Sequence, residues 1–426
     1  MEIPPVFAMF ERESHMERVV ITGIGSVSAL GHNTNTMFQN LVSGVSGVGP
    51  ISHFDTEGHD TKIAAEVRDL AMEKYFDVKS LKKFDRFSQF AWIASEEAMT
   101  QSGLQSGSFD PHRAGVLIGS GIGGIMTLEA TMEQYRLRGT KGVSPFFISN
   151  LISNEAGGNV AIRYGFQGVN FGIVSACSTG THCIGESFKA IRYGEQDIMI
   201  AGGTEASITP LTVAGFSNMK AMSRNNQNPK GASRPFDKDR DGFVIGEGSG
   251  VLVMESLTHA SKRGARILAE VIGYGATCDA HHITAIAPGG EGMARAIQLA
   301  VKQAGVGLEA VDYINAHGTS TPIGDKYETE CIKSVFKDHA NRLSISSTKS
   351  MIGHLLGAAG GVESVVCVKS LLEQCVHPTM NLDNPDEGCD LDYVAKEARQ
   401  KKLSVVLKNS MGFGGHNAAL LFRAFA

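Results

Sequence analysis

Residues 171–187 read FGIVSACSTGTHCIGES, and the rest of the chain is best understood from this stretch. The apolar run 171–174 predicts a short strand, and the segment 180–193 predicts a helix. Cys177 lies between them, among small residues that allow a sharp turn. Unpaired N–H groups and the dipole at a helix N-terminus favour a thiolate, the nucleophilic form of cysteine. We therefore predict that Cys177 is a catalytic nucleophile held as an anion.

The other six of the seven cysteines have a simpler interpretation. A free cysteine is most often a small buried apolar residue, and Cys183 is expected to pack inside the helix that follows Cys177. The rest show no CxxC pairing, which argues against a zinc site and a redox dithiol: Cys278, Cys331, Cys367, Cys375 and Cys389. An odd number of cysteines without framework spacing is typical of a reducing compartment, so we expect a cytoplasmic protein.

The composition is that of a globular protein, with 426 residues of which 42% are hydrophobic and 19% charged. A net charge of −5 argues against a general nucleic-acid binder. No run approaches the roughly 18 consecutive apolar residues of a membrane span. Residues 1–15 are acidic and resemble neither a secretory signal nor a transit peptide, so we expect an appendage outside the fold.

Strand-like and helix-like segments alternate along the chain, which predicts an α/β architecture with helix-covered sheets. The expected strands are 18–25, 114–118, 197–203, 251–255 and 269–275, and the expected helices include 36–43 and 79–102. The charged, glycine-rich segment 234–250 is interpreted as a structural or site-lining loop. Units of strand, small turn and helix recur in VSACSTG, INAHGTST and LKNSMGFGGHN. We predict two similar halves, 16–270 and 271–426.

Gly119 to Gly124 formally matches GxGxxG, the fingerprint of a dinucleotide site. That fingerprint also requires a second strand ending in an acid about 20 residues later. The sequence instead continues into a polar segment with Glu129 and Glu133. We therefore interpret the glycines as a tight turn.

Two histidines follow strand-like segments, His317 in YINAHGTST and His354 in SISSTKSMIGHLLGAAGG, whereas His259, His281 and His282 are interpreted as structural or solvated. A cysteine with one histidine suits a hydrolase, but a cysteine with two suits carbon–carbon bond formation from a malonyl thioester. Loss of carbon dioxide leaves an enolate, which two neutral imidazoles stabilise by donating N–H. A nearby helix N-terminus keeps an imidazole neutral. Backbone N–H groups at Cys177 and near Phe413 are candidates for an oxyanion hole, each worth about 3 kcal/mol.

Four motifs, taken in order, resemble the elongating β-ketoacyl-[acyl-carrier-protein] synthases of the ketosynthase II type. The motifs are VSACSTGTHC, NAHGTSTPIGD, SSTKSMIGHLLGAAGGVES and NSMGFGGHN. The likeness runs from about Arg18 to the C-terminus. It implies the thiolase-like fold, a duplicated α/β core in five layers (αβαβα), in a homodimer. It also implies condensation of a carrier-bound acyl chain with malonyl-[acyl-carrier-protein] in type II fatty acid elongation, giving the 3-oxoacyl product and carbon dioxide. No cofactor of the enzyme itself is implied, since the phosphopantetheine arm enters on the acyl carrier protein.

The resemblance also implies roles for single residues. Cys177 resembles the acylated nucleophile, while His317 and His354 resemble the decarboxylating pair. Lys349 is implied to organise the loop of His354 through its charge and hydrogen bonds. Glu363 either completes that network or is an ordinary helix-face carboxylate, and the sequence leaves the two interpretations even.

Substrate contacts follow by the same route. Thr319 and Thr321 are implied to bind the phosphopantetheine arm, and Phe413 resembles a gate residue with room to move between glycines. Ile122 and Phe216 are implied to line the acyl tunnel, although composition alone makes them core residues.

Carrier proteins are acidic, and the basic residues proposed as their docking patch are Lys79, Lys82, Lys83, Lys141 and Lys220. Taken singly, each is more simply a solvated surface lysine. Two positions depart from the family pattern, Met411 where phenylalanine is frequent and His416 where threonine is common. We expect Met411 to affect gate packing and His416 to be a loop residue.

Rival functions share the fold or the nucleophile. A polyketide-type ketosynthase is the nearest alternative. A thiolase needs a second catalytic cysteine in the C-terminal glycine-rich loop, which here reads MGFGGHN. A chain-length-factor-like subunit without chemistry is disfavoured by the presence of Cys177, His317 and His354. A cysteine hydrolase is disfavoured by the paired histidines. The initiating relatives of the family pair their cysteine with one histidine and one asparagine, so the histidine at position 354 argues against that branch.

Overall fold

The computed structural model describes residues 16–105 and 107–425, so the predicted appendage 1–15 lies outside the described residues. One large sheet has the strand order β4 (Ala114–Gly119), β5 (Ile198–Glu205), β6 (Gly248–Ser256), β1 (Val19–Val27), β7 (Ala269–Cys278), β13 (His416–Ala424), β12 (Val405–Gly412), β8 (Tyr313–Asn315) and β9 (Ser344–Ser346). Two short pairs lie apart from it, β2 (Gly49–Pro50) with β3 (Ile63–Ala64), and β10 (Cys375–Val376) with β11 (Arg399–Gln400).

The large sheet is built from two equivalent sets of strands. In the first set β4 is parallel to β5, β5 is antiparallel to β6, and β6 is antiparallel to β1. In the second set β8, β12, β13 and β7 repeat those senses in the same order. Beyond β8 lies parallel β9, and beyond β4 a parallel bridge joins Val116 to Asn170. The predicted duplication is thus confirmed by topology, and pairing of residues 19–21 with 269–271 joins the two sets.

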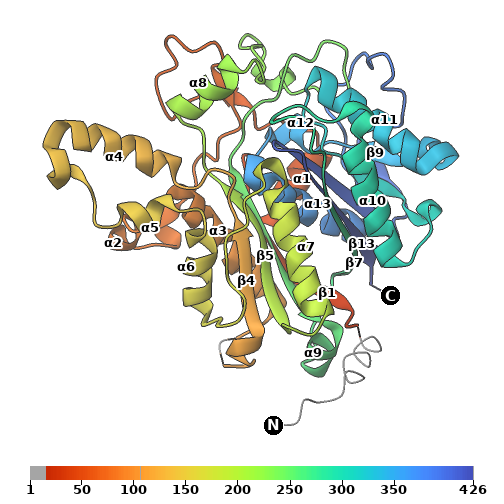
Figure 1. Cartoon of the computed structure of the whole chain (residues 1–426), viewed down its shortest axis with the longest axis horizontal. Helices are drawn as coiled ribbons and strands as arrows, with labels where there is room; N and C mark the ends of the chain where they lie inside the picture. Colours follow the sequence, from red (N-terminus) through yellow and green to blue (C-terminus); the bar gives the residue numbers. More distant parts are fainter. Residues whose placement is uncertain (1–15, 106, 426) are drawn as a thin grey trace.

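Helices form three further layers (Figure 1). One outer layer covers the first set of strands and contains α3 (Arg86–Ser102) and α6 (Glu155–Tyr164). The other outer layer covers the second set and contains α10 (Glu291–Ala304) and α11 (Pro322–Phe336). Between the two sets lie α7 (Thr179–Arg192) and α13 (Ala359–Glu373), which contact strands of both. The remaining helices are α1 (Thr34–Val42), α2 (Val78–Leu81), α4 (Ile125–Arg138), α5 (Phe147–Leu151), α8 (Pro210–Asn218), α9 (Leu257–Lys262) and α12 (Lys349–Ile352).

Small residues allow the middle layer to form. A Cβ atom on Gly180 of α7 would lie 2.6 Å from the backbone nitrogen of Gly361 in α13. A Cβ on Gly250 of β6 would lie 2.2 Å from the nitrogen of Val362. Because real Cβ contacts are longer, only glycine lets the two helices and the sheet approach this closely. The first turn of each middle helix is therefore held against the other, and that is where the site lies.

The predicted strands and helices exist, with three corrections. Residues 171–175 are irregular rather than a strand, because only Asn170 bridges to the sheet at this edge. The pattern 79–102 is two helices, since the carboxylate of Asp85 accepts the N–H of Phe87 and begins α3 anew. The motif NSMGFGGHN is a hairpin of β12 and β13 rather than a strand followed by a helix, and Gly414 and Gly415 make its turn with positive φ.

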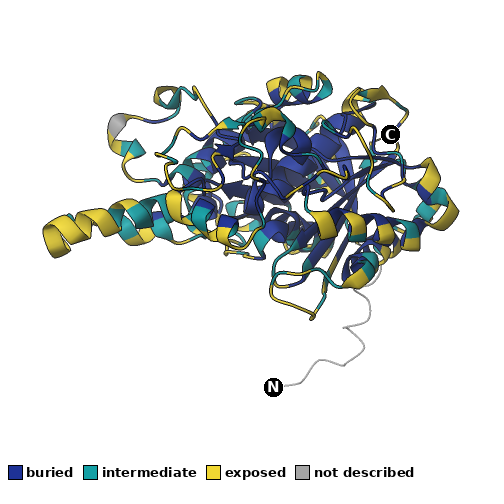
Figure 2. Ribbon diagram, turned by 90° about the horizontal axis from the view of Figure 1, so that it is seen from above, coloured by how far each residue is buried: buried dark blue, intermediate teal, exposed yellow. Residues whose placement is uncertain are grey.

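An arm made of α4, α5 and the turn between them projects from the body (Figure 1). Figure 2 shows it as mostly exposed, and α4 has no buried residue. Large apolar side chains on the arm face solvent in the single chain, including Leu137 at 77% exposure and Ile148 at 60%. No helix within 16–105 and 107–425 combines the length and apolarity that crossing a bilayer requires.

Candidate active site

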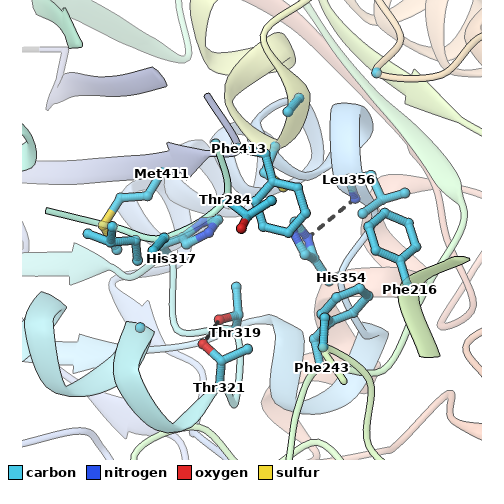
Figure 3. A pocket seen from close by; sticks show the side chains of 18 of the residues that line it. Phe216, Phe243, Thr284, His317, Thr319, Thr321, His354, Leu356, Met411 and Phe413 are labelled. Carbon is cyan, nitrogen blue, oxygen red and sulfur yellow. Dashed lines mark hydrogen bonds between the residues drawn. The ribbon is translucent and has the colours of Figure 1, made fainter. Parts of the chain in front are cut away.

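A cavity of about 420 Å³ opens between the two halves, and Figure 3 shows it from close by. Cys177, His317 and His354 all line it. The side chains predicted to contact substrate line the same cavity, namely Ile122, Phe216, Thr319, Thr321 and Phe413. The structure therefore brings together eight residues from six separate segments of the sequence.

Cys177 lies in a sharp turn at the start of α7. It belongs to a short 3-10 turn, Ala176–Ser178, and the preceding Ala176 has a φ of +50°. The second half repeats this turn ahead of α13, where Leu356 has a φ of +48°. Positive φ at a residue other than glycine is strained and clusters at functional sites. Both middle helices thus begin with the same strained turn, and only the first carries a thiol.

The protonation of Cys177 is opposite to the prediction. The side chain is buried, with 8% exposure, and this burial raises the pKa of the Cys177 thiol to about 12. The charge of Lys349 and the backbone N–H groups of Phe413 and Cys177 act the other way but do not overcome it. The prediction of a resting thiolate is therefore wrong, because desolvation exceeds the helix contribution. The two N–H groups that contact the sulfur are the pair predicted for the oxyanion hole.

His354 is held between α12 and the turn before α13. Its Nδ1 accepts the backbone N–H of Leu356 at 3.3 Å, so the ring proton of the neutral form lies on Nε2. The edge of Phe243 packs against the ring, with centroids 5.4 Å apart. Burial, and then the positive charge of Lys349, holds the pKa of His354 well below its usual 6.5. The neutral state was predicted, but burial rather than a helix N-terminus is its main cause.

His317 follows β8 and faces His354, with the ring centroids 5.5 Å apart and the planes perpendicular. Burial also holds the pKa of His317 well below 6.5. The Glu328 carboxylate, fully buried on α11, accepts the backbone N–H of His317 and of Gly318, each at 2.7 Å. Sequence reasoning missed Glu328, which lies on α11, the helix that follows the His317 loop.

Asp325 fixes the loop that carries the two threonines. Its carboxylate accepts the N–H groups of Phe236 and Ser320 and lies 3.4 Å from Arg240. Burial raises the pKa of Asp325 to about 7. Arg240 donates to the carbonyl of Thr321 at 3.0 Å. The segment 234–250 is therefore a structural and lining loop, as predicted.

Lys349 and Glu363 lie behind the cavity wall as a buried ion pair. Glu363 is on α13 and has no exposed surface, so it is part of the network and not an ordinary helix-face carboxylate. A second buried cation, Lys408 on β12, lies 2.8 Å from the other oxygen of Glu363. Sequence reasoning missed Lys408, because nothing in the local pattern marks a strand lysine as buried.

The hydroxyls of Thr319 and Thr321 lie 2.9 Å apart and face the cavity (Figure 3). Phe413, in the turn between β12 and β13, packs 6.3 Å from Phe216, which in turn packs 5.3 Å from Phe243. The aromatic side chains thus connect the predicted gate to the ring of His354.

The other singled-out positions are placed as follows. Met411 is buried and lines the cavity, whereas His416 begins β13 and is not a loop residue as predicted. The glycines 119–124 form the turn after β4, and the buried carboxylate of Glu205 accepts the N–H of Gly121 there. That carboxylate occupies the position an anionic ligand would need, which favours the tight-turn interpretation.

The five docking lysines are all exposed and lie in three segments of the chain. Lys79, Lys82 and Lys83 are on or next to α2, Lys141 is in the turn at the end of α4, and Lys220 follows α8 (Figure 1).

The fold and the site define a thiolase-like α/β protein of the ketosynthase class. A type II polyketide ketosynthase, solved in complex with its acyl-carrier protein, has a TM-score of 0.88 and 36% identity, covering 96% of this chain and 100% of that one. The β-ketoacyl synthase N-terminal domain matches residues 16–260 and the C-terminal domain matches 268–383. The chain belongs to the β-ketoacyl synthase family.

Curated relatives extend over nearly the whole chain. The 3-oxoacyl-[acyl-carrier-protein] synthase 2 of Coxiella burnetii is 49% identical over 404 residues, 95% of this chain and 98% of the relative. The enzyme of the same name from Staphylococcus aureus (strain COL) is 47% identical over 412 residues, 97% and 99% of the two chains. The resemblance inferred from the four motifs is thereby confirmed.

The raised pKa of Cys177 predicts its alkylation profile. With a pKa near 12, the thiolate fraction grows about tenfold per pH unit, so the rate of alkylation by iodoacetamide should still rise between pH 8 and pH 10. Peptide mass mapping measures this, and the exposed Cys278 in the same sample reports on the reagent. A Cys177 rate that is already flat above pH 7 would show a resting thiolate and contradict the assignment.

Proposed function

We propose that this chain catalyses the decarboxylative condensation of an acyl group, held on Cys177, with malonyl-[acyl-carrier-protein]. The products are 3-oxoacyl-[acyl-carrier-protein] and carbon dioxide, and the setting is type II fatty acid elongation. The observation that carries the proposal is the single cavity shared by Cys177, His317 and His354. The chain is 49% identical to a relative named for this activity and 36% identical to a solved polyketide ketosynthase. This difference in identity supports fatty acid elongation over the polyketide alternative.

The first half-reaction transfers the acyl chain to the enzyme. Sγ of Cys177 attacks the carbonyl carbon of the acyl thioester, and the bond from that carbon to the pantetheine sulfur breaks. The proton that leaves Cys177 ends on the departing pantetheine thiol, so no resting thiolate is needed. The N–H groups of Cys177 and Phe413, which contact the sulfur, are proposed to stabilise the oxyanion. The resulting thioester is neutral, which suits the buried position of the sulfur.

The second half-reaction uses the histidines. The bond from the malonyl methylene to its carboxylate breaks, carbon dioxide leaves, and the electron pair forms an enolate. Nε2–H of His354 and the ring of His317 donate to the enolate oxygen, and both rings are neutral because their pKa values are low. The enolate carbon then attacks the Cys177 thioester, and the released sulfur takes up a proton. No resident cofactor is required in this scheme.

The carrier's phosphopantetheine arm is proposed to enter along Thr319 and Thr321, whose hydroxyls offer hydrogen-bond partners on the cavity wall. The acyl chain is proposed to run past Ile122 and Phe216, which give the cavity its apolar wall. Phe413 is proposed to act as the gate, because the hairpin turn that carries it ends in two glycines with positive φ.

A homodimer is proposed from two exposed features. The N–H groups of residues 172–174 donate no hydrogen bond within the described part of the chain, and Phe171 and Val174 are more than half exposed. An unpaired sheet edge beside apolar side chains is suited to the same edge of a second copy, and the arm supplies further apolar surface. In analytical sedimentation, the Val174→Asp variant should have the mass of one chain, and the unchanged protein should have the mass of two. If both proteins have the mass of one chain, the dimer is ruled out.

A cytoplasmic location is proposed because all seven cysteines, each within the described residues, are free thiols. Cell fractionation tests this directly.

The division of labour predicts distinct variant behaviour. Cys177→Ala should abolish the acyl-enzyme adduct in intact mass spectra, while Cys183→Ala, which removes a buried thiol on α7 directly after the turn of Cys177, should keep it. His317→Ala and His354→Ala should lower condensation on the order of a hundredfold, with a much smaller loss of acyl transfer. Carbon dioxide release from the malonyl substrate should persist in Cys177→Gln. Equal losses in both half-reactions would contradict the roles given to the histidines.

Docking through basic residues predicts a charge-dependent affinity. Lys82→Glu with Lys83→Glu should raise KM for the acyl carrier protein on the order of tenfold with little change in kcat, since long-range attraction aids encounter. The effect should shrink as salt increases, because salt screens exposed charges. Lys262→Glu on α9 is the exposed control and should leave KM unchanged. A salt-independent KM in the unchanged protein would remove the docking proposal.

A further inference from the structure

Lys408 is a lysine with no exposed surface in the middle of a central strand. Lysine is almost never fully buried unless it is paired. Its Nζ lies 2.8 Å from Oε2 of Glu363, donates to Oγ of Ser410 at 3.0 Å, and also donates to the carbonyl of Asn409. The ammonium group therefore forms an ion pair with one carboxylate oxygen and donates to two neutral oxygens, which suits a buried positive charge.

The contacts of Lys408 connect several of the elements that surround the cavity. Glu363 belongs to α13 and is paired on its other oxygen with Lys349 of α12. Ser410, two residues along β12, shares a 2.7 Å hydrogen bond with Thr181, which lies one turn after Cys177 in α7. Lys408 is thus the point where β12, α13 and the nucleophile helix are connected by polar contacts.

One carboxylate between two ammonium groups leaves one positive charge uncompensated within the triad Lys349, Glu363 and Lys408. Six titratable groups on neighbouring elements face the triad or the two histidines. They are Cys367 on α13, Tyr313 on β8, His377 after β10, Glu328 on α11, Cys177 before α7 and Glu205 on β5. Burial raises the pKa of Tyr313 and Cys367 and lowers that of His377 to about 4, so these three are neutral.

The two carboxylates facing the triad are already engaged by neutral donors. Glu328 accepts the amide of Asn409 and the backbone N–H groups of the His317 loop. Glu205 accepts N–H and O–H groups at the Cys177 side of the cavity. The charges of Lys349 and Lys408 both act on His317 and His354 in the direction that disfavours their protonation.

We propose that Lys408 is a positioning residue for the histidine pair: it neutralises Glu363, so that the charge of Lys349 stays directed at His317 and His354. Without Lys408, Lys349 and Glu363 cancel, and the cavity loses the positive field that adds to burial in disfavouring protonation of both imidazoles and that favours a developing enolate. The proposal rests on the function proposed above, and it assigns a role to a residue that makes no contact with the cavity.

Lys408→Met removes the charge and keeps most of the side-chain volume. The expected result is a shift of the acid limb of malonyl decarboxylation to higher pH, on the order of one unit, because removing a nearby positive charge raises a histidine pKa. A role in stability alone would lower the rate by the same factor at each pH. Lys369→Met is the matched control: Lys369 is on the same helix as Glu363, is 9% exposed and pairs with Glu373, and its variant should keep the acid limb in place.

A second comparison covers the case in which Lys408→Met does not fold. Glu363→Gln leaves two lysines without a carboxylate and should move the acid limb to lower pH. The double variant Glu363→Gln with Lys408→Met keeps one lysine charge, as the unchanged triad does in sum, and should restore the original limb. Identical limbs for Lys408→Met and the unchanged protein, or for the double variant and Glu363→Gln, would overturn the proposal.

A measurement that needs no catalytic turnover tests the role of Lys408 separately from the proposed condensing activity. The pH dependence of diethylpyrocarbonate modification of His354 in the free protein reports its pKa directly, and Lys408→Met should shift that profile in the same direction as the acid limb. If no condensation is observed but the modification profile shifts, the proposed function fails and the role of Lys408 stands. If condensation occurs and neither profile shifts, the role of Lys408 is wrong.

Discussion

Desolvation around one cavity sets the chemical state of every group in this site. It keeps the Cys177 sulfur protonated against the charge of Lys349, and it keeps both imidazoles neutral together with the charges of Lys349 and Lys408. A site of this kind is poorly suited to holding resting ions in its cavity. It is well suited to a sequence of neutral states, thiol, thioester and imidazole, through which a negative charge passes only transiently, close to fixed N–H donors and a buried positive charge.

The duplicated fold explains why these groups meet. Each half starts a middle-layer helix with the same strained turn, one at Ala176 and one at Leu356. The first turn presents the thiol, and in the second half the corresponding backbone N–H of Leu356 fixes the tautomer of His354. The glycines that let α7 and α13 touch therefore serve chemistry as well as packing, since any larger residue would separate the thiol from the imidazoles.

Sequence reasoning succeeds where chemistry is carried by local pattern. The small-residue turn at Cys177, the strand-end positions of His317 and His354, and the glycine hairpin at Phe413 all follow from their own neighbourhoods. It fails for Glu328, Asp325 and Lys408, because their partners are brought near only by helix docking and strand pairing. It also misjudges residues 171–174, which form no strand pairing within the described residues. It misjudges the thiolate as well, because its energy depends on a depth of burial that a linear pattern does not contain.

The central claim is that the imidazoles are neutral donors within a buried cavity. The most direct measurement is the pair of imidazole nitrogen shifts of His354 in protein labelled with nitrogen-15 histidine, followed by NMR from pH 5 to pH 8. The account predicts one neutral tautomer throughout, with the proton on Nε2 and Nδ1 unprotonated. An imidazolium signal for His354 at pH 6.5 would contradict it.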